Sequence, residues 1–228
     1  MIYPDDFIDQ IICGDCLEVM QGIPDKSIDL VLTDPPYGIN YLSNMRGERF
    51  NRIINDENDY RLVTYPILNE KLKEDSVALI FCSFKNYSKD YLELTSYFDV
   101  KNCIIWDKGG GGIGDLFHSL LTDYEMVIVA HKGKCLIRGK RDGSVWNYPK
   151  VPPSKMIHPT QKPIELIKAL IEKFSDENDL ILDPFLGSGT TALACLELNR
   201  HFIGIELSPE YCEIARNRIS KIQPQLVF

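Results

Sequence analysis

The segment LILDPFLGSGTTALACLEL, residues 180–198, joins an apolar run to a helix-like run through a glycine-rich turn. A short apolar run is typical of a strand covered on both faces, and a glycine-rich turn before a helix brings backbone N–H groups close to a ligand. Strand-like and helix-like runs alternate in the same way along the rest of the chain. The pattern predicts an α/β fold, in which a doubly wound, largely parallel sheet carries helices on both faces.

Apolar runs at nearly every position mark the expected strands. They are residues 10–13, 27–33, 76–82, 100–106, 124–130, 179–183 and 201–206. Helical periodicity is clearest in residues 162–174 and 209–222. The second of these follows Ser208, a good N-cap residue, and begins with Pro209, which suits the first helical position.

Length and composition fit one α/β domain over residues 1–228. The chain is 44% hydrophobic and 25% charged, which excludes disordered, collagen-like and coiled-coil proteins. No apolar run approaches the roughly 18 to 20 residues that span a bilayer. The first ten residues, MIYPDDFIDQ, hold acids where a signal peptide has bases, so we expect a cytoplasmic protein without a membrane partner.

Seven cysteines, an odd number without framework spacing, are expected to be reduced and mostly buried. Cys13 and Cys16 form a CxxC pair, which invites a zinc or redox interpretation. A structural zinc site needs a second pair of ligands, and no CxxC or closely spaced histidine pair follows. We therefore expect no metal site.

The charge distribution suggests a contact with a polyanion. The net charge is −8, yet eight bases and one acid lie between residues 131 and 162, with Trp146 and Tyr148 among them. Little periodicity is visible in residues 131–160, and Gly109–Gly112 with Gly114 suggest a second irregular connection. A solvated loop is the alternative, but this density of bases with aromatic residues favours nucleic acid.

The glycine-rich turn has the features of a nucleoside-cofactor site. Glu206 ends a predicted strand nineteen residues beyond Gly187, where a carboxylate can accept hydrogen bonds from both ribose hydroxyls. The turn also satisfies the G-x-G-x-x-A pattern of NAD-binding folds. Asp183 would repel a pyrophosphate but suits the ammonium of an amino-acid cofactor, which points to S-adenosylmethionine.

A second motif, Asp34-Pro35-Pro36-Tyr37, ends the predicted strand 27–33. Two prolines fix the backbone, so the Asp34 carboxylate and the Pro35 carbonyl form a rigid pair of acceptors. Such a pair can hold the two N–H groups of an exocyclic base amine and free its lone pair for attack on a sulfonium methyl group. Tyr37 can stack on a base swung out of a duplex.

At this point the chain resembles the β-class of amino-group DNA methyltransferases, a circularly permuted arrangement that uses S-adenosylmethionine. The resemblance rests on Gly14-Asp15, DPPY at 34–37, HPTQKP at 158–163, DPFLGSGTT at 183–191, and Ile205-Glu206 with SPEY at 208–211. The order of these motifs covers nearly the whole chain. It implies methyl transfer to a base flipped out of double-stranded DNA.

The resemblance also implies a role for each matching residue. Asp34, Pro35, Pro36 and Tyr37 would form the catalytic motif. Thr160 and Lys162 would reach the cofactor carboxylate, and Asp15 the adenine amino group. The full cofactor set would be Asp15, Thr160, Lys162, Asp183, Phe185, Gly187, Ser188, Gly189, Thr190 and Glu206.

Target recognition would fall to a short basic insertion at about residues 131–157. Its expected DNA contacts are Lys132, Lys134, Arg138, Lys140 and Arg141. So short an insertion suggests a short target site or help from a partner subunit. The family often dimerises, but no sequence feature here shows a homodimer.

Adenine N6 is the expected target atom. With Asp34 where other members of the family have the serine of SPPY, the motif resembles the enzymes that modify adenine more than those that modify cytosine. The alternatives are cytosine N4, RNA, a protein amide, a noncatalytic DNA-binding module, or an NAD-dependent oxidoreductase. The last of these gives no role to residues 34–37.

Overall fold

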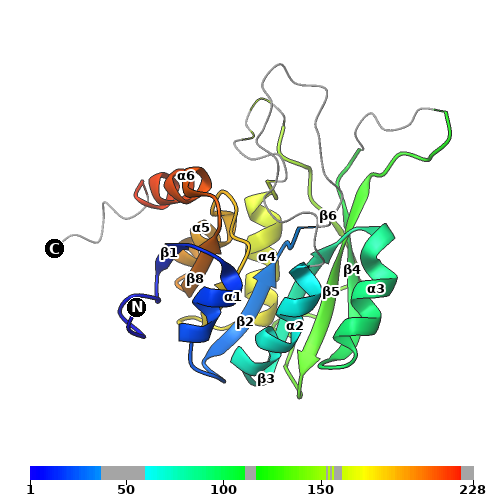
Figure 1. Ribbon diagram of the computed structural model, residues 1–228. Coiled ribbons are helices and arrows are strands. Elements are labelled where there is room, and N and C mark those ends of the chain that lie inside the picture. Colours follow the sequence, from blue (N-terminus) through cyan, green and yellow to red (C-terminus); the bar gives the residue numbers. More distant parts are fainter. Residues whose placement is uncertain (37–59, 111–116, 153, 155, 157–160, 222–228) are drawn as a thin grey trace.

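The computed structural model describes residues 1–36, 60–110, 117–152, 154, 156 and 161–221. In these residues one eight-stranded sheet has the order β1-β8-β7-β2-β3-β5-β4-β6 (Figure 1). The strands are β1 Gln10–Cys13, β2 Ile28–Thr33, β3 Leu72–Cys82, β4 Asp99–Asp107, β5 Tyr124–Lys132, β6 Val145–Asn147, β7 Leu180–Asp183 and β8 His201–Glu206.

The sheet is largely parallel, as the sequence predicts. β1, β8, β7, β2 and β3 pair in parallel, and β6 pairs in parallel with β4. β5 is antiparallel to both of its neighbours, β3 and β4. The carboxyl ends of the parallel strands therefore all meet at the upper edge of the sheet in Figure 1.

Helices cover both faces of the sheet. α1 (Cys16–Val19), α2 (Tyr60–Lys71) and α3 (Phe84–Leu94) pack on one face. α4 (Ile164–Phe174), α5 (Thr190–Glu197) and α6 (Pro209–Ile219) pack on the other. A short 3-10 helix, η1 (Met20–Gly22), follows α1.

Alternation along β3 shows why both faces need a cover. Val77, Leu79 and Phe81 belong to the core beneath α4, α5 and α6. The intervening Ala78, Ile80 and Cys82 belong to the core beneath α1, α2 and α3. Side chains alternate across a strand, so an apolar run without interruption buries both faces, which confirms the doubly wound prediction.

Two sequence-predicted helices appear with nearly the expected bounds. α4 buries Ile167, Leu170 and Ile171, whose spacing of three to four residues places them on one face of the helix. α6 begins at Pro209, and the Ser208 side chain accepts a hydrogen bond from the Tyr211 backbone N–H, as expected of an N-cap.

The connections reverse direction between β2 and β7. From β2 the chain passes through α2 to β3 on one side, and from β7 it passes through α5 to β8 on the other side. In open α/β sheets a ligand binds in the crevice at the carboxyl ends of such a pair of strands. The topology therefore locates the site before any side chain is considered.

The described part of the segment that begins at residue 131 is more regular than its sequence indicates. β5 continues through His131 to Lys132, which pairs with Ser76. Residues Val145–Asn147 form β6 beside Ile105–Asp107 of β4. Three residues are too few for periodicity to reveal, and this edge strand depends on β4 for its hydrogen bonds.

A buried polar cluster joins α2 to α3. Arg61 Nε lies 3.1 Å from Asp90 Oδ1, and the two side chains are 4% and 1% exposed. The Tyr65 hydroxyl donates to the same carboxylate oxygen at 3.0 Å.

Among the described residues, no helix has the length and apolar character needed to cross a membrane.

We expect Asp90→Ala to lower the free energy of unfolding by about 3 kcal/mol, because it removes the carboxylate that faces a buried guanidinium. Urea unfolding followed by circular dichroism measures this loss. Asp99→Ala is the control, since it breaks an exposed ion pair with Lys101 and should cost less than about 1 kcal/mol. Equal losses in the two variants would contradict the expected role of Asp90.

Candidate active site

A cavity of about 590 Å³ opens at the carboxyl ends of β2 and β7. Its walls include Asp34, Pro35 and Pro36, which follow β2, and the turn of residues 183–188, which follows β7. The Thr33 hydroxyl donates to Asp183 Oδ1 at 3.0 Å, so the ends of the two strands are directly connected. The structure thus brings both sequence motifs into one site.

Asp183 is a buried carboxylate, and its donors among the described residues are neutral. Its Oδ2 accepts from the Thr191 hydroxyl at 2.6 Å, and its Oδ1 accepts from Thr33 and from the Phe185 backbone N–H. Burial raises the pKa of Asp183 to about 7, because no cation among the described residues compensates its charge. Such a carboxylate suits a cationic ligand.

The turn after β7 is shaped by glycines and docked on β8. Gly187 and Gly189 have φ of 57° and 83°, a region that glycine adopts without strain. A Cβ at Gly189 would lie 2.8 Å from Ala215 Cβ of α6. Glu206 Oε2 accepts from the Gly187 N–H at 2.8 Å, and Oε1 accepts from the Ser208 N–H, so Glu206 is fixed at the cavity wall.

Three more predicted cofactor residues lie at this turn. Phe185, Ser188 and Thr190 line the cavity. The guanidinium of Arg218, on α6, donates to the Ser188 backbone oxygen at 2.5 Å and also reaches the hydroxyls of Ser188 and Thr190. Arg218 was not expected from the sequence, and it braces the start of α5.

Asp15 lies at the wall that β1 contributes. Its Oδ1 accepts from the Leu17 N–H at 2.8 Å, which caps α1, and its Oδ2 accepts from the Tyr60 hydroxyl. Burial, together with the Asp15 carboxylate, raises the pKa of Tyr60, so the phenol stays protonated as the donor. Tyr60 lines the same cavity, and no local pattern in the sequence indicates it.

Lys162 lines the same cavity, where its ammonium lies between two carboxylates. Its ammonium lies 2.7 Å from Asp34 Oδ2 and 2.7 Å from Glu125 Oε2. Glu125 Oε1 lies 2.9 Å from the Lys108 ammonium. Although burial favours the neutral amine, the two carboxylates dominate and raise the pKa of Lys162 above its usual range. Glu125 and Lys108 were missed, although Glu125 is a lone acid in the apolar run 124–130.

Two predicted site residues lie outside the described residues. They are Tyr37 of the catalytic motif and Thr160 of the HPTQKP segment. Their roles stay predictions.

The expected DNA contacts lie at the lower edge of the sheet, opposite the cavity. Lys132 donates to the backbone oxygens of Asn69 and Leu72, at the start of β3. Arg138 forms an ion pair with Asp176 at 2.8 Å, just beyond the end of α4. Both side chains thus contact other parts of the protein. β5 runs antiparallel to β3, so its end at Lys132 lies at the edge of the sheet opposite the cavity.

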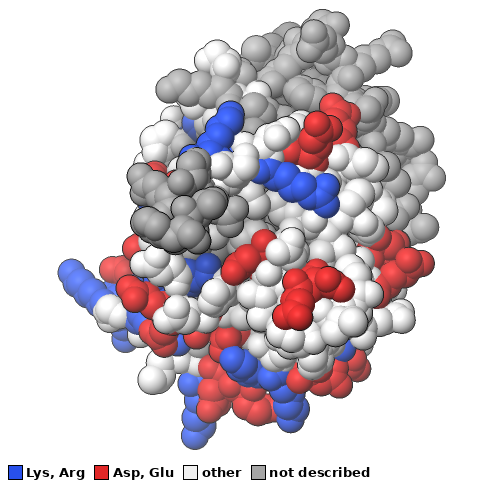
Figure 2. All heavy atoms as spheres, turned by 90° about the vertical axis from the view of Figure 1, so that its left-hand side faces the viewer, with Lys and Arg blue, Asp and Glu red and all other residues white. Residues whose placement is uncertain are grey.

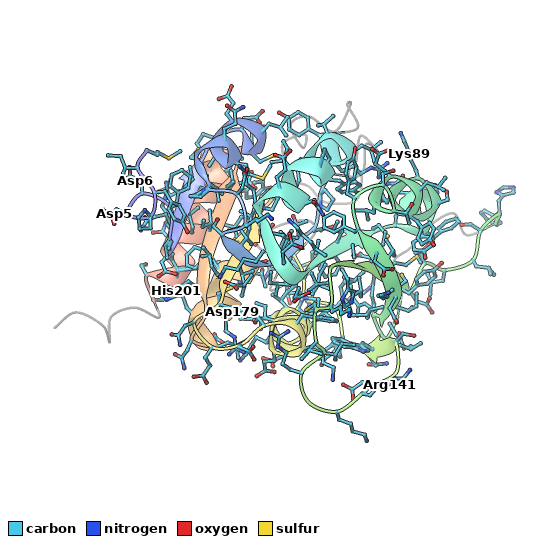
Figure 3. The ribbon with its side chains drawn as sticks, turned by 90° about the horizontal axis from the view of Figure 1, so that it is seen from below. Asp5, Asp6, Lys89, Arg141, Asp179 and His201 are labelled. Carbon is cyan, nitrogen blue, oxygen red and sulfur yellow. The ribbon has the colours of Figure 1, made fainter. Side chains whose placement is uncertain are left out.

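Two more of the predicted contacts, Lys134 and Lys140, are also held by residues of the protein. The Lys134 N–H donates to Asp75, and the Lys140 backbone oxygen accepts from the ammonium of Lys173 in α4. Figure 3 shows Arg141 projecting outward on the loop between β5 and β6. The sequence assigned these residues to the DNA, but the structure does not bring them to the catalytic edge.

The flank formed by β1 and α6 offers no alternative basic surface in the part that the structure describes. Figure 2 shows acidic and basic side chains interspersed there, with uncharged atoms between them. A duplex contact needs clustered bases, so this flank is unsuited to it.

The chain is similar to DNA methyltransferases over nearly its whole length. Residues 28–217 match the profile of a DNA methylase family of N6 and N4 enzymes. Type II methyltransferase M.HinfI of Haemophilus influenzae is 31% identical over 96% of this chain and 70% of its own. DNA adenine methyltransferase YhdJ of Escherichia coli is 28% identical over 92% of this chain and 82% of its own.

Solved structures show the same fold. The complex of M1.HpyAVI with S-adenosylmethionine is 28% identical, with a TM-score of 0.74 over 92% of this chain and 98% of that one. The cytosine-N4-specific PvuII DNA methyltransferase is 19% identical, with a TM-score of 0.74 over 94% of this chain and 89% of that one. The fold, the order of the motifs and the match over residues 28–217 agree, and the chain belongs to the N6/N4 DNA methylase family.

Proposed function

We propose that this protein transfers a methyl group from S-adenosylmethionine to the N6 amino group of adenine in double-stranded DNA. The observation that carries the proposal is the meeting of Asp34 and Asp183 in one cavity, at the ends of two adjacent parallel strands. One carboxylate can hold a base amine while the other holds the methyl donor.

The carboxylates along the cavity suit three hydrogen-bond-donating groups of this cofactor. When bound, S-adenosylmethionine supplies an activated methyl group on a sulfonium. Asp183 would accept from its ammonium group, Glu206 from its ribose hydroxyls and Asp15 from its adenine amino group. The orientation of Glu206 and Asp15 is already fixed by backbone N–H groups, so little ordering is needed on binding.

Asp34 and Pro35 would position the target amine. The Asp34 carboxylate and the Pro35 carbonyl each accept one N–H, which turns the nitrogen lone pair toward the methyl donor. Asp34 also stabilises the positive charge that develops on the nitrogen, and the amine then releases one proton to water. Tyr37, the next residue after Pro36, would supply the ring on which the flipped base stacks.

Adenine is favoured over cytosine by the aspartate of the motif and by the relative that is a DNA adenine methyltransferase. Cytosine N4 is the second candidate, because the cytosine-N4-specific PvuII enzyme shares the fold. Both bases present a similar exocyclic amine, so the distinction needs a chemical test.

We expect unmethylated DNA treated with the protein and S-adenosylmethionine to yield N6-methyladenine on digestion to nucleosides. Mass spectrometry identifies the modified base. N4-methylcytosine as the sole product would establish the second candidate, and unmodified DNA would refute both.

Asp34→Ala should lower the single-turnover rate of methyl transfer at least about 100-fold, because it removes one of the two amine acceptors. Binding of S-adenosylmethionine, measured by calorimetry, should persist. Near wild-type transfer by this variant would remove Asp34 from the mechanism.

Affinity for S-adenosylmethionine should fall as the pH drops below 7. Asp183 must be ionised to attract the ammonium, and its pKa of about 7 means that protons compete with the ligand. The dissociation constant should rise toward about tenfold for each pH unit between pH 7 and 5. Calorimetry at fixed ionic strength measures this dependence.

Asp183→Asn is the matched variant for the pH series. It should bind weakly at every pH with a flat profile, because an amide carries no charge to titrate. A wild-type dissociation constant that stays level from pH 7 to 5 would rule out Asp183 as the ammonium ligand.

A further inference from the structure

Four charged side chains of alternating sign form a chain that ends on Asp34. Lys108 contacts Glu125 at 2.9 Å, Glu125 contacts Lys162 at 2.7 Å, and Lys162 contacts Asp34 at 2.7 Å. The four residues come from four separate parts of the sequence: after β4, within β5, before α4 and after β2. The fold therefore brings these four side chains together at the catalytic edge, and no local sequence motif contains them all.

The members are largely shielded from solvent. Their side chains are 16% exposed for Lys108, 22% for Glu125, 9% for Lys162 and 20% for Asp34. The Lys162 ammonium also lies 4.8 Å from the centre of the Phe81 ring. Because solvent screens these charges poorly, removing one of them should change the electrostatic environment of its neighbour.

We propose that Glu125, supported by Lys108, is a positioning residue that holds the Lys162 ammonium between two carboxylates and so sets the position and charge of Asp34. The proposal rests on the proposed function, in which Asp34 accepts the target amine. The family resemblance assigns Lys162 to the cofactor and gives no role to Glu125 or Lys108.

The geometry gives each member a distinct task. Lys162 has three N–H donors, and Asp34 and Glu125 each take one. If Glu125 lost its charge, Asp34 would be the one carboxylate left among these four side chains to pair with the buried Lys162 ammonium. Lys162 would then bind Asp34 more tightly. A carboxylate held more tightly by lysine is a weaker acceptor for a base amine.

The chain is a fixed support and not a pH switch. The two lysines, although opposed by burial, lower the pKa of Glu125, and the two carboxylates raise the pKa of Lys162. Both groups therefore stay ionised at neutral pH, and the two positive and two negative charges balance.

Glu125→Gln keeps the size of the side chain and removes its charge. We expect a drop of about 10- to 100-fold in the single-turnover rate on unmethylated genomic DNA at saturating S-adenosylmethionine. The dissociation constant for S-adenosylmethionine should stay within about twofold of wild type, because the ligand would contact Asp183, Glu206 and Asp15 instead.

The pH profile separates positioning from loss of folding. In Glu125→Gln the acid limb of the rate profile should move to lower pH, because the Lys162 charge then stabilises the Asp34 carboxylate more strongly. In Lys162→Met it should move to higher pH. A general loosening of the site would not shift the acid limb in opposite directions in the two variants.

Lys108→Met is the second variant, and it tests the same chain if Glu125→Gln folds poorly. It should lower the rate about 3- to 10-fold, and Lys108→Arg should restore it, because arginine can pair with Glu125 again. Glu197→Gln is the matched control, since it breaks the Lys168–Glu197 pair of 2.9 Å between α4 and α5 and should leave the rate unchanged.

The outcomes distinguish this proposal from the proposed function. Wild-type rates in both Glu125→Gln and Lys108→Met, with Asp34→Ala inactive, would overturn the positioning role and leave the methyltransferase intact. A parallel loss of rate, S-adenosylmethionine binding and melting temperature would show a merely structural role and also overturn it. An active Asp34→Ala, or a wild-type protein that modifies no DNA, would refute the proposed function itself.

Discussion

The parallel pairing of β2 with β7 is the constraint on which the site depends. Leu30 pairs with Ile181 and Val31 with Leu182, which brings Thr33 and Asp183 within hydrogen-bonding distance at the strand ends. The two strands are about 150 residues apart in the chain, so only the sheet can bring their motifs together. Because the chain turns in opposite directions after β2 and β7, the crevice between their ends stays open.

Much of this arrangement is readable from the sequence. The apolar runs of the predicted strands indicate a sheet buried on both faces, and the structure places all of them in it. The apolar runs and the glycine turn of residues 180–206 predict a strand–turn–helix–strand unit, and the structure forms it as β7, α5 and β8. Local signals suffice wherever a motif and the element that carries it are continuous in the chain.

The rest depends on contacts between distant residues. Tyr60 contacts Asp15, and Glu125 contacts Lys162, because the fold brings together residues that are far apart in the chain. The position of the basic insertion likewise depends on the fold. Charge density indicated nucleic acid, but charge says nothing about the edge of the sheet at which a loop emerges. The direction of β5 decides that, and it sends Arg138 to the lower edge, where it pairs with Asp176.

The carboxylates of the cavity fall into two classes, and the difference fits their proposed tasks. Asp183 and Glu206 contact neutral donors, and burial raises the pKa of both. They lack a protein cation among the described residues. In the proposed function the ammonium of the methyl donor would compensate the charge of Asp183, and Glu206 would accept from neutral hydroxyls. Asp34 instead forms an ion pair with Lys162. Its charge is therefore balanced before any ligand arrives, which leaves it ready to respond to charge that develops on a base amine rather than to the binding of the methyl donor.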